Sequence, residues 1–279
     1  MKSGVLIVLL ALSFLPLSVW AAESPTPAPT TAVPATITLA TTTSVENSGL
    51  LDALLPRFEK ESGIKVKVVA VGTGAALRIA REGNADLVFV HDPKGEEKFV
   101  SEGFGTERIP VMYNYFWILG PAADPAGIKG LSPEEAFRKI AAAKVLFVSR
   151  GDKSGTHEKE LNLWEKAGIK PAGEWYLESG QGMIETLRIA SQKKAYTLTD
   201  NATYLFHRKD LDLSPMINSG SDLLINHYSL IPLNPAKNSR LKKEEASALV
   251  AFFRSPAVQE LIAAYGKEKA GEPLFFISK

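Results

Sequence analysis

The stretch that decides the fold is TITLATTTSVENSGLLDALLPRFEKESGIKVKVVAV, residues 36–71. Its first part is rich in β-branched residues and predicts a strand. Its middle part predicts a helix that starts at Asn47 or Ser48, stops at Gly63 and is kinked or broken early by Pro56. The apolar face of this helix is formed by Leu50, Leu51, Leu54, Leu55 and Phe58. The last part, IKVKVVAV, predicts a second strand, so the stretch indicates a parallel strand–helix–strand unit.

The same alternation continues along the chain. Helices are predicted within 72–84, 91–103, 132–143, 150–168 and 180–194, and strands within 85–90, 144–149, 174–179 and 195–200. Residues 223–235 form an extended return segment, and residues 242–266 hold two helices split at Pro256. We therefore expect an α/β protein of two lobes, the first formed by 36–113 and 227–279 and the second by 114–226. Such a chain crosses twice between the lobes and leaves a ligand cleft between them.

The amino-acid composition excludes several classes of function. The 279 residues are 45% hydrophobic and 23% charged, with a formal net charge of +1, which gives no field suited to nucleic acid or to an anionic membrane. An anionic ligand would have to be attracted locally. The sequence contains no cysteine, which excludes disulfides, thiolate metal sites, a thiol nucleophile and the lipid attachment of a bacterial lipoprotein.

The N-terminal residues indicate export. Lys2 precedes the apolar run VLIVLLALSFLPLSV, and small residues allow cleavage after Ala21 or Ala22, as in a secretory signal peptide over residues 1–21. An uncut membrane anchor is the alternative, although Pro16 near the end of a short run argues against it. Residues 22–35 form a Pro/Thr-rich linker with too few apolar residues to pack. The domain is thus expected in the periplasm or a similar extracytoplasmic space.

Four segments follow a predicted strand and precede a predicted helix: 41–44, 72–74, 91–92 and 150–156. Open α/β sheets bind ligands at such points, because helix N-termini there present unpaired N–H groups. The segment TTTS, residues 41–44, offers a row of hydroxyls, although threonine is also common in strands and serine caps helices. A Gly-x-Gly turn such as 72–74 is frequent and decides nothing by itself.

The segment SRGDKSGTHEKE, residues 149–160, permits several interpretations. Arg150 could bind a tetrahedral oxyanion in a bidentate manner, with Ser154, Gly155 and Thr156 as further donors at a helix start. It could equally be an exposed arginine beside a capped helix. Arg-Gly-Asp is also an adhesion tripeptide, but three common residues match by chance. A catalytic Ser154/His157 pair would lack the glycine elbow of a nucleophile.

Histidine occurs at positions 91, 157, 207 and 227, without the spacing of a helical metal site, so no metal is expected. His91 follows a strand end at the presumed cleft, where it could donate to an anion or cap the loop. The tryptophans and phenylalanines favour a core rather than a ligand cage.

With these segments together, the sequence resembles the tungstate-binding proteins of bacterial and archaeal ABC importers. The resemblance rests on ATTTSVENSGLLDALLPRFEKESGIKV, VGTGAAL, ADLVFVHDP, SRGDKSGTHEKELNLW, SGQGM and YTLTD, and it spans nearly the whole chain after the linker. A wider resemblance to phosphate-binding proteins lies in the spacing of Arg150, Ser154, Gly155 and Thr156.

The resemblance implies the two-lobed, type II periplasmic-binding-protein fold and a set of oxyanion-binding residues: Thr42, Thr43, Ser44, Thr73 and His91 from the first lobe, and Arg150, Ser154 and Thr156 from the second. SGQGM and Asp200 match family segments near the cleft without assigned contacts. The lobes would close about crossovers near Asn114 and His227.

The implied function is that of a non-enzymatic, monomeric solute-binding protein without a cofactor, which captures tungstate and delivers it to a membrane permease. Molybdate, phosphate and, as an enzyme, a phosphorylated substrate are the alternatives. Tungstate and molybdate are deprotonated dianions that need donors only, whereas hydrogen phosphate rewards an acceptor carboxylate. The choice therefore depends on whether Asp92 or Asp152 points into the site.

Overall fold

The computed structural model describes residue 1, residues 34–218 and residues 220–278. Residues from Pro34 onward form one compact unit. The predicted signal peptide, 1–21, and linker, 22–35, lie almost entirely outside the described residues. None of the helices in the described ranges has the length and apolar character needed to cross a bilayer.

The first sheet is built on the strand–helix–strand unit of residues 36–71. Strand β1 (Thr36–Thr42) pairs in parallel with β2 (Lys65–Val71) and with β3 (Leu87–Val90). Strand β9 (Ile225–Pro232) then adds antiparallel to β3, and β4 (Ile109–Gly120) adds antiparallel to β9. The short strand β10 (Phe276–Ile277) also pairs with β4. The predicted parallel pairing is confirmed, and the C-terminal part completes this sheet.

The second sheet begins on the same strand β4, whose residues 116–120 pair with β7 (Tyr196–Asp200) and β8 (Ser214–Ile217). Strand β5 (Phe147–Ser149) lies parallel to β7 on one side and to β6 (Tyr176–Glu178) on the other. The strand order through both sheets is β2-β1-β3-β9-β4-β7-β5-β6. Strand β4 therefore belongs to both sheets, while β9 pairs only within the first.

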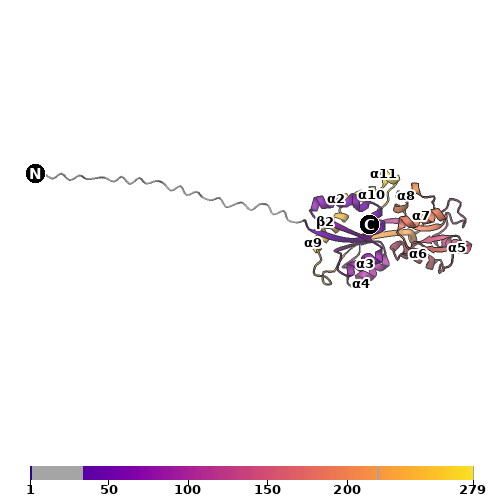
Figure 1. Ribbon diagram of the computed structural model, residues 1–279, viewed down its shortest axis with the longest axis horizontal. Coiled ribbons are helices and arrows are strands. Elements are labelled where there is room, and N and C mark those ends of the chain that lie inside the picture. Colours follow the sequence, from indigo (N-terminus) through magenta and orange to yellow (C-terminus); the bar gives the residue numbers. More distant parts are fainter. Residues whose placement is uncertain (2–33, 219, 279) are drawn as a thin grey trace. The chain divides into compact units, whose positions relative to one another are not determined.

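Helices cover both faces of each sheet (Figure 1). On the first sheet, α2, α9 and α10 pack on one face and α3 and α4 on the other; on the second, α7 and α8 pack on one face and α5 and α6 on the other. The helices are α1 (Thr43–Asn47), α2 (Leu50–Ser62), α3 (Thr73–Arg81), α4 (Pro93–Ser101), α5 (Pro133–Ala143), α6 (Gly155–Lys166), α7 (Met183–Lys193), α8 (Asn201–His207), α9 (Lys243–Arg254), α10 (Pro256–Ala264) and α11 (Lys267–Ala270), with 3₁₀ turns η1 (Arg208–Asp210) and η2 (Asp222–Leu224). We call the first sheet with its helices the first lobe and the second sheet with its helices the second lobe.

The two chain crossings between lobes lie side by side. Asn114 on β4 is the register partner of Asn226 on β9, and both side chains are buried. The predicted crossovers near Asn114 and His227 fall on this pair of strands. The lobe boundaries 113/114 and 226/227 remain a prediction.

The first helix differs from its prediction in its start and in the effect of Pro56. The chain does not enter one helix at Asn47 or Ser48: the short helix α1 ends at Asn47, Gly49 adopts a left-handed conformation (φ 71°), and α2 starts at Leu50. The early break at Pro56 is also wrong, since α2 continues to Ser62, while the alternative of a kink there stays a prediction. Pro56 is exposed, so water can bind the carbonyl group that its missing N–H leaves free, while the buried Leu54, Leu55 and Phe58 anchor the helix.

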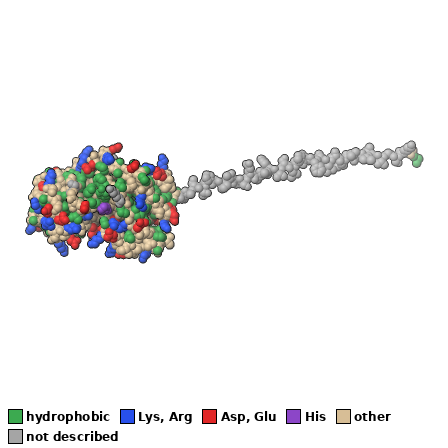
Figure 2. All heavy atoms as spheres, turned by 180° about the vertical axis from the view of Figure 1, so that it is seen from behind, with side chains coloured by type: hydrophobic (Ala, Val, Ile, Leu, Met, Phe, Trp, Pro, Cys, Tyr) green, Lys and Arg blue, Asp and Glu red, His purple; other side chains and the backbone are tan. Residues whose placement is uncertain are grey.

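Charges are mixed on the surface. Figure 2 shows Lys and Arg side chains interspersed with Asp and Glu over the face it presents. This distribution agrees with the formal net charge of +1 and with the expectation that any anion is attracted locally.

Candidate functional site

The strand-end loops of the two lobes face each other. A Cβ atom added at Gly155, the first residue of α6, would lie 2.9 Å from Cε1 and 3.2 Å from the carbonyl oxygen of His91 at the end of β3. One added at Gly74 in α3 would lie 3.8 Å from the carbonyl oxygen of Lys153. Loops far apart in sequence thus meet, and glycine permits the closest approach.

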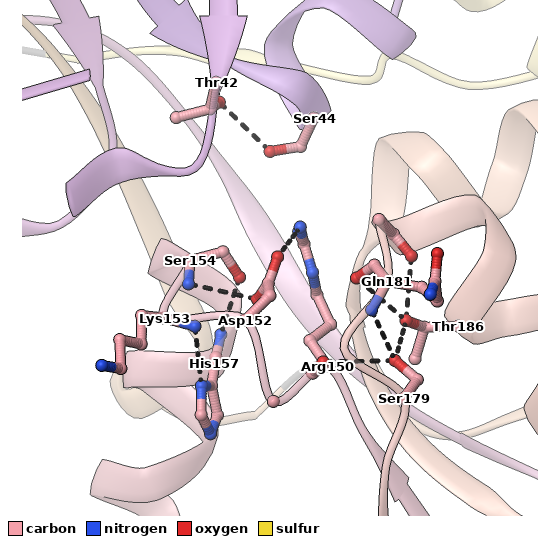
Figure 3. Close-up of polar contacts among 12 residues, drawn as sticks. Thr42, Ser44, Arg150, Asp152, Lys153, Ser154, His157, Ser179, Gln181 and Thr186 are labelled. Carbon is pink, nitrogen blue, oxygen red and sulfur yellow. Dashed lines mark hydrogen bonds and ion pairs between the residues drawn. The ribbon is translucent and has the colours of Figure 1, made fainter. Parts of the chain in front are cut away.

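Arg150 is the central cation of this region. Its side chain is only 3% exposed and reaches from its loop toward Thr42 and Ser44 (Figure 3). Nη2 lies 2.5 Å from Oδ2 of Asp152, and Oδ1 of Asp152 accepts a hydrogen bond from the Ser154 N–H, 3.1 Å. The carbonyl oxygen of Arg150 accepts hydrogen bonds from the Gly180 N–H and the Ser179 hydroxyl. Arg150 is therefore held both at its guanidinium group and at its backbone carbonyl group.

The glycine of the Arg-Gly-Asp sequence has a structural role. Gly151 adopts a left-handed conformation (φ 64°), and an added Cβ atom would lie 2.7 Å from the Cβ atom of Glu178. Because Arg150 is buried and paired with Asp152, a partner protein cannot reach the tripeptide as an exposed adhesion loop does. The adhesion interpretation is not supported by this geometry.

The hydroxyls at the end of β1 form a bonded row. Thr42 caps α1 by accepting a hydrogen bond from the Val45 N–H. Its Oγ1 atom lies 3.2 Å from Oγ of Ser44, which in turn lies 3.1 Å from Nε2 of His91. Thr42 and Ser44 are buried and Thr43 is half-buried.

The start of α6 supplies the next group of donors. Ser154 caps the helix, because its Oγ accepts a hydrogen bond from the backbone N–H of His157. The imidazole Nδ1 of His157 accepts from the Lys153 N–H instead of meeting the Ser154 hydroxyl. This arrangement gives no serine nucleophile with a histidine base.

Three polar atoms of the predicted site are buried without a protein partner: Oγ1 of Thr73, Nε of Arg150 and Oγ1 of Thr156. Within the described residues only eight buried side-chain nitrogen or oxygen atoms are unpaired in this way. Such atoms carry a free-energy cost of about 1–3 kcal/mol each unless something binds them. Thr73 and Thr156 lie in the first turns of α3 and α6 and Arg150 lies just before α6, so both lobes present buried atoms that a ligand would stabilise.

His91 is buried and neutral. Nδ1 lies 3.1 Å from Oδ1 of Asn226, and Nε2 contacts Ser44. Burial, and then the charge of Arg150, lower the pKa of His91 to about 4. Both ring nitrogens thus face protein atoms. A direct contact of His91 with an oxyanion stays a prediction.

Two of the three nearby carboxylates, those of Asp152 and Asp200, are bonded to protein groups. Asp152 binds Arg150 and the Ser154 N–H. Asp200 accepts hydrogen bonds from both the backbone N–H and the hydroxyl of Thr203; burial raises its pKa, and these bonds partly offset the rise. Oδ2 of Asp92 would lie 2.4 Å from a Cβ atom added at Gly95, so this carboxylate lies over the first turn of α4. The remaining groups of the site are mainly donors.

Two features escaped the sequence analysis. Ser179 and Gly180 of the SGQGM segment hold the Arg150 carbonyl group, and the Asn114/Asn226 pair reaches the site through His91. The family resemblance placed SGQGM near the cleft but did not assign its contacts. As for metals, the described ranges contain no group of three or more His, Cys, Asp or Glu side chains that could hold an ion.

Two lobes joined by adjacent crossing strands, with their donor loops in contact across the junction, define a two-lobed solute-binding protein. The family model described as a PBP superfamily domain matches residues 26–257, and the chain belongs to that family. It is 48% identical over 242 residues to the tungstate-binding protein TupA of Peptoclostridium acidaminophilum, which covers 86% of this chain and 84% of that protein.

Solved structures agree with the fold. The tungstate-binding protein TupA from Desulfovibrio alaskensis G20 superposes with a TM-score of 0.75 at 42% identity, covering 88% of this chain and 99% of that chain. The tungstate ABC transporter structure from Geobacter sulfurreducens gives a TM-score of 0.75 at 46% identity, covering 82% of this chain and 98% of that chain. The prediction of a two-lobed periplasmic-binding-protein fold is confirmed.

Proposed function

We propose that the protein is the periplasmic solute-binding component of an ABC importer, that it captures tungstate and that it delivers this anion to a membrane permease. The relatives from these bacteria are tungstate-binding or tungstate-transport proteins, and none of them is described as an enzyme. Molybdate is the alternative ligand, because it is a dianion of the same shape. The protein acts as a monomer without a cofactor.

The observation that carries this proposal is the set of unpaired buried atoms on Thr73, Arg150 and Thr156. A hydroxyl and a guanidinium N–H are donors, and they come from both lobes. A tetrahedral oxyanion has acceptor oxygens on every side, so it can bind such atoms simultaneously. The proposed contact residues are Thr42, Thr43, Ser44, Thr73, Arg150, Ser154 and Thr156, and His91 lies beside them, bonded to Ser44.

The charge balance favours a fully deprotonated dianion. Asp152 and Asp200 are bonded to protein partners and Asp92 lies over the first turn of α4, so a proton on hydrogen phosphate would find few acceptors. Arg150 supplies the counter-charge, and the low-dielectric surroundings strengthen its attraction for an anion. Closure about β4 and β9 would bury the anion among these donors.

Calorimetric titration of the purified domain, residues 36–279, with tungstate, molybdate, sulfate and phosphate in a phosphate-free buffer tests the proposal. We expect tight one-to-one binding of tungstate, weaker binding of molybdate and no heat from phosphate. Tight phosphate binding would instead indicate an inward carboxylate, and a lack of heat from every oxyanion would contradict the proposal in favour of an enzyme.

A further inference from the structure

His91 lies where three parts of the molecule meet. It follows β3 in the first lobe, contacts Ser44 at the end of β1 and contacts Asn226 on the crossing strand β9. Gly155 of the second lobe packs against its ring. With an exposure of 3% and the ring of Tyr228 at a centroid distance of 4.8 Å, the imidazole has little freedom to turn toward a ligand.

The hydrogen bonds of Asn226 fix the position of the imidazole hydrogen. Its Nδ2 atom donates to Oδ1 of Asn114, 2.8 Å, and to the hydroxyl oxygen of Tyr228, 2.9 Å. Oδ1 of Asn226 therefore faces Nδ1 of His91, 3.1 Å away. Because an amide oxygen only accepts, Nδ1 carries the hydrogen.

The other ring nitrogen is then an acceptor. A neutral imidazole has one hydrogen, so Nε2 has none and accepts from the Ser44 hydroxyl, 3.1 Å away. The depressed pKa of His91, about 4, supports the neutral form, with burial as the main cause and Arg150 as the second. A bonded path thus runs from Thr42 through Ser44, His91 and Asn226 to Asn114.

We propose that His91 is a positioning residue which, with its hydrogen on Nδ1, ties the Ser44 hydroxyl to the Asn226–Asn114 pair on the two crossing strands and does not itself contact the oxyanion. The inference rests on the proposed function. It adds a link between residues 41–44, which would contact the ligand, and the strands β4 and β9 that join the lobes. Asn226 forms no hydrogen bond to any of the proposed contact residues, yet its replacement should alter oxyanion affinity through His91.

The tautomer is measured by ¹⁵N NMR of the histidine-labelled domain at pH 7, free and saturated with tungstate, with His91→Gln used to assign the signal. We expect hydrogen on Nδ1 alone in both states. Hydrogen on Nε2, which would require both asparagine amides to be reversed, or a doubly protonated ring in the tungstate complex, would overturn the proposal. If no oxyanion binds, the proposed function fails, and the spectrum of the free protein still decides the tautomer.

A variant tests the link to the crossing strands. Asn226→Ala removes the acceptor for Nδ1, so we expect the His91 hydrogen to shift toward Nε2 and the tungstate Kd to rise about tenfold or more, as for the loss of one buried hydrogen bond. Asn234→Ala is the control, because the Asn234 amide donates to the Gly103 carbonyl group far from His91 in the hydrogen-bond network. It should change neither the tautomer nor the Kd. An unchanged tautomer and affinity in a folded Asn226→Ala protein would contradict the proposal.

Discussion

Nη2 of Arg150 lies 2.5 Å from Oδ2 of Asp152, so the buried cation of the site is already oriented by a carboxylate two residues away. The pair leaves Nε of Arg150 without a protein partner. An anion entering the site would meet a guanidinium group whose position is fixed in advance, which reduces the entropy lost on binding.

Arg150→Gln should weaken tungstate binding by about 2–5 kcal/mol, because the dianion would be buried without its counter-charge. Arg150→Lys should restore charge without the planar fork and give an intermediate Kd. Calorimetry measures both. Arg57→Gln, which removes an exposed arginine paired with Glu61 on α2, is the control and should leave the tungstate Kd unaltered. Wild-type affinity in the Arg150→Gln variant would exclude Arg150 as the anion's main partner.

Thr73→Val and Thr156→Val should have opposite effects on stability and on binding. Each removes a buried hydroxyl that has no protein partner, so the free protein should keep or gain stability in urea unfolding. The tungstate Kd should rise about 10- to 100-fold, since a hydrogen bond to a charged group contributes about 1.5–3 kcal/mol.

Thr197→Val serves as the control for these two variants. Its buried hydroxyl donates to the Val148 carbonyl, 2.7 Å, so this change should lower stability and leave the tungstate Kd unaltered. Valine variants at 73 and 156 that destabilise the protein and bind normally would show that these hydroxyls serve the fold.

Gly155→Ala should hinder lobe closure. The added methyl group would lie 2.9 Å from Cε1 and 3.2 Å from the carbonyl oxygen of buried His91, and such overpacking costs about 1–3 kcal/mol. Tungstate affinity should fall by a similar free energy, while small-angle X-ray scattering should show a more open tungstate-loaded protein. Gly74→Ala also faces the opposite lobe, but with an ordinary 3.8 Å contact, and should bind normally. Equal affinities of the two variants would contradict closure at this contact.

Glu96 should make the protein less stable as pH rises. Burial raises its pKa to about 7, although Oε2 accepts from Nε of Arg108 and Oε1 from the Asp92 N–H. The folded state thus retains a proton that the unfolded chain releases above its ordinary pKa of 4.5. This contribution to the free energy of unfolding is complete below pH 4.5 and is lost by about pH 7, a change of about 3 kcal/mol.

The pH dependence of Glu96 is isolated by comparing unfolding free energies of the wild type and Glu96→Gln across this range, because every other titrating group is present in both proteins. The difference should shift in favour of the variant as pH rises from 4.5 to 7. Glu61→Gln, an exposed residue paired with Arg57 on α2, is the control and should give a flat difference. A flat difference for Glu96→Gln as well would mean that the carboxyl group ionises normally.

Periodicity predicted most of the fold because a strand or helix buried on one face needs apolar residues at a fixed spacing. The parallel pairing of β1 with β2 and the helix break at Pro256 follow from such local signals. Helix α1 could not be predicted in this way, because a run of threonines is typical of a strand and the capping of α1 by Thr42 is seen only in the structure. Pro56 wrongly predicted a break in the helix, because its exposure and the packing of its neighbours depend on the tertiary structure.

The candidate site was predictable only in part. Loops at strand ends and a buried-cation motif have sequence signals, and the structure brings 41–44, 73, 91 and 150–156 together. The His91–Asn226–Asn114 contacts have none, because the partners are separated by 135 and 112 positions and are joined only through sheet register. The carboxylate directions of Asp92 and Asp152 likewise depend on rotamers that spacing does not encode.

Strand β4 pairs with β9 through Tyr115 and with β7 from Phe116 onward, without a loop between the two segments. The angle between the lobes is consequently tied to the local twist of one continuous strand. Substitutions that alter strand twist near Tyr115, far from Arg150 in the sequence, would change how far the protein opens while leaving every donor in place. Affinity and release rate could then evolve separately, through different parts of the chain.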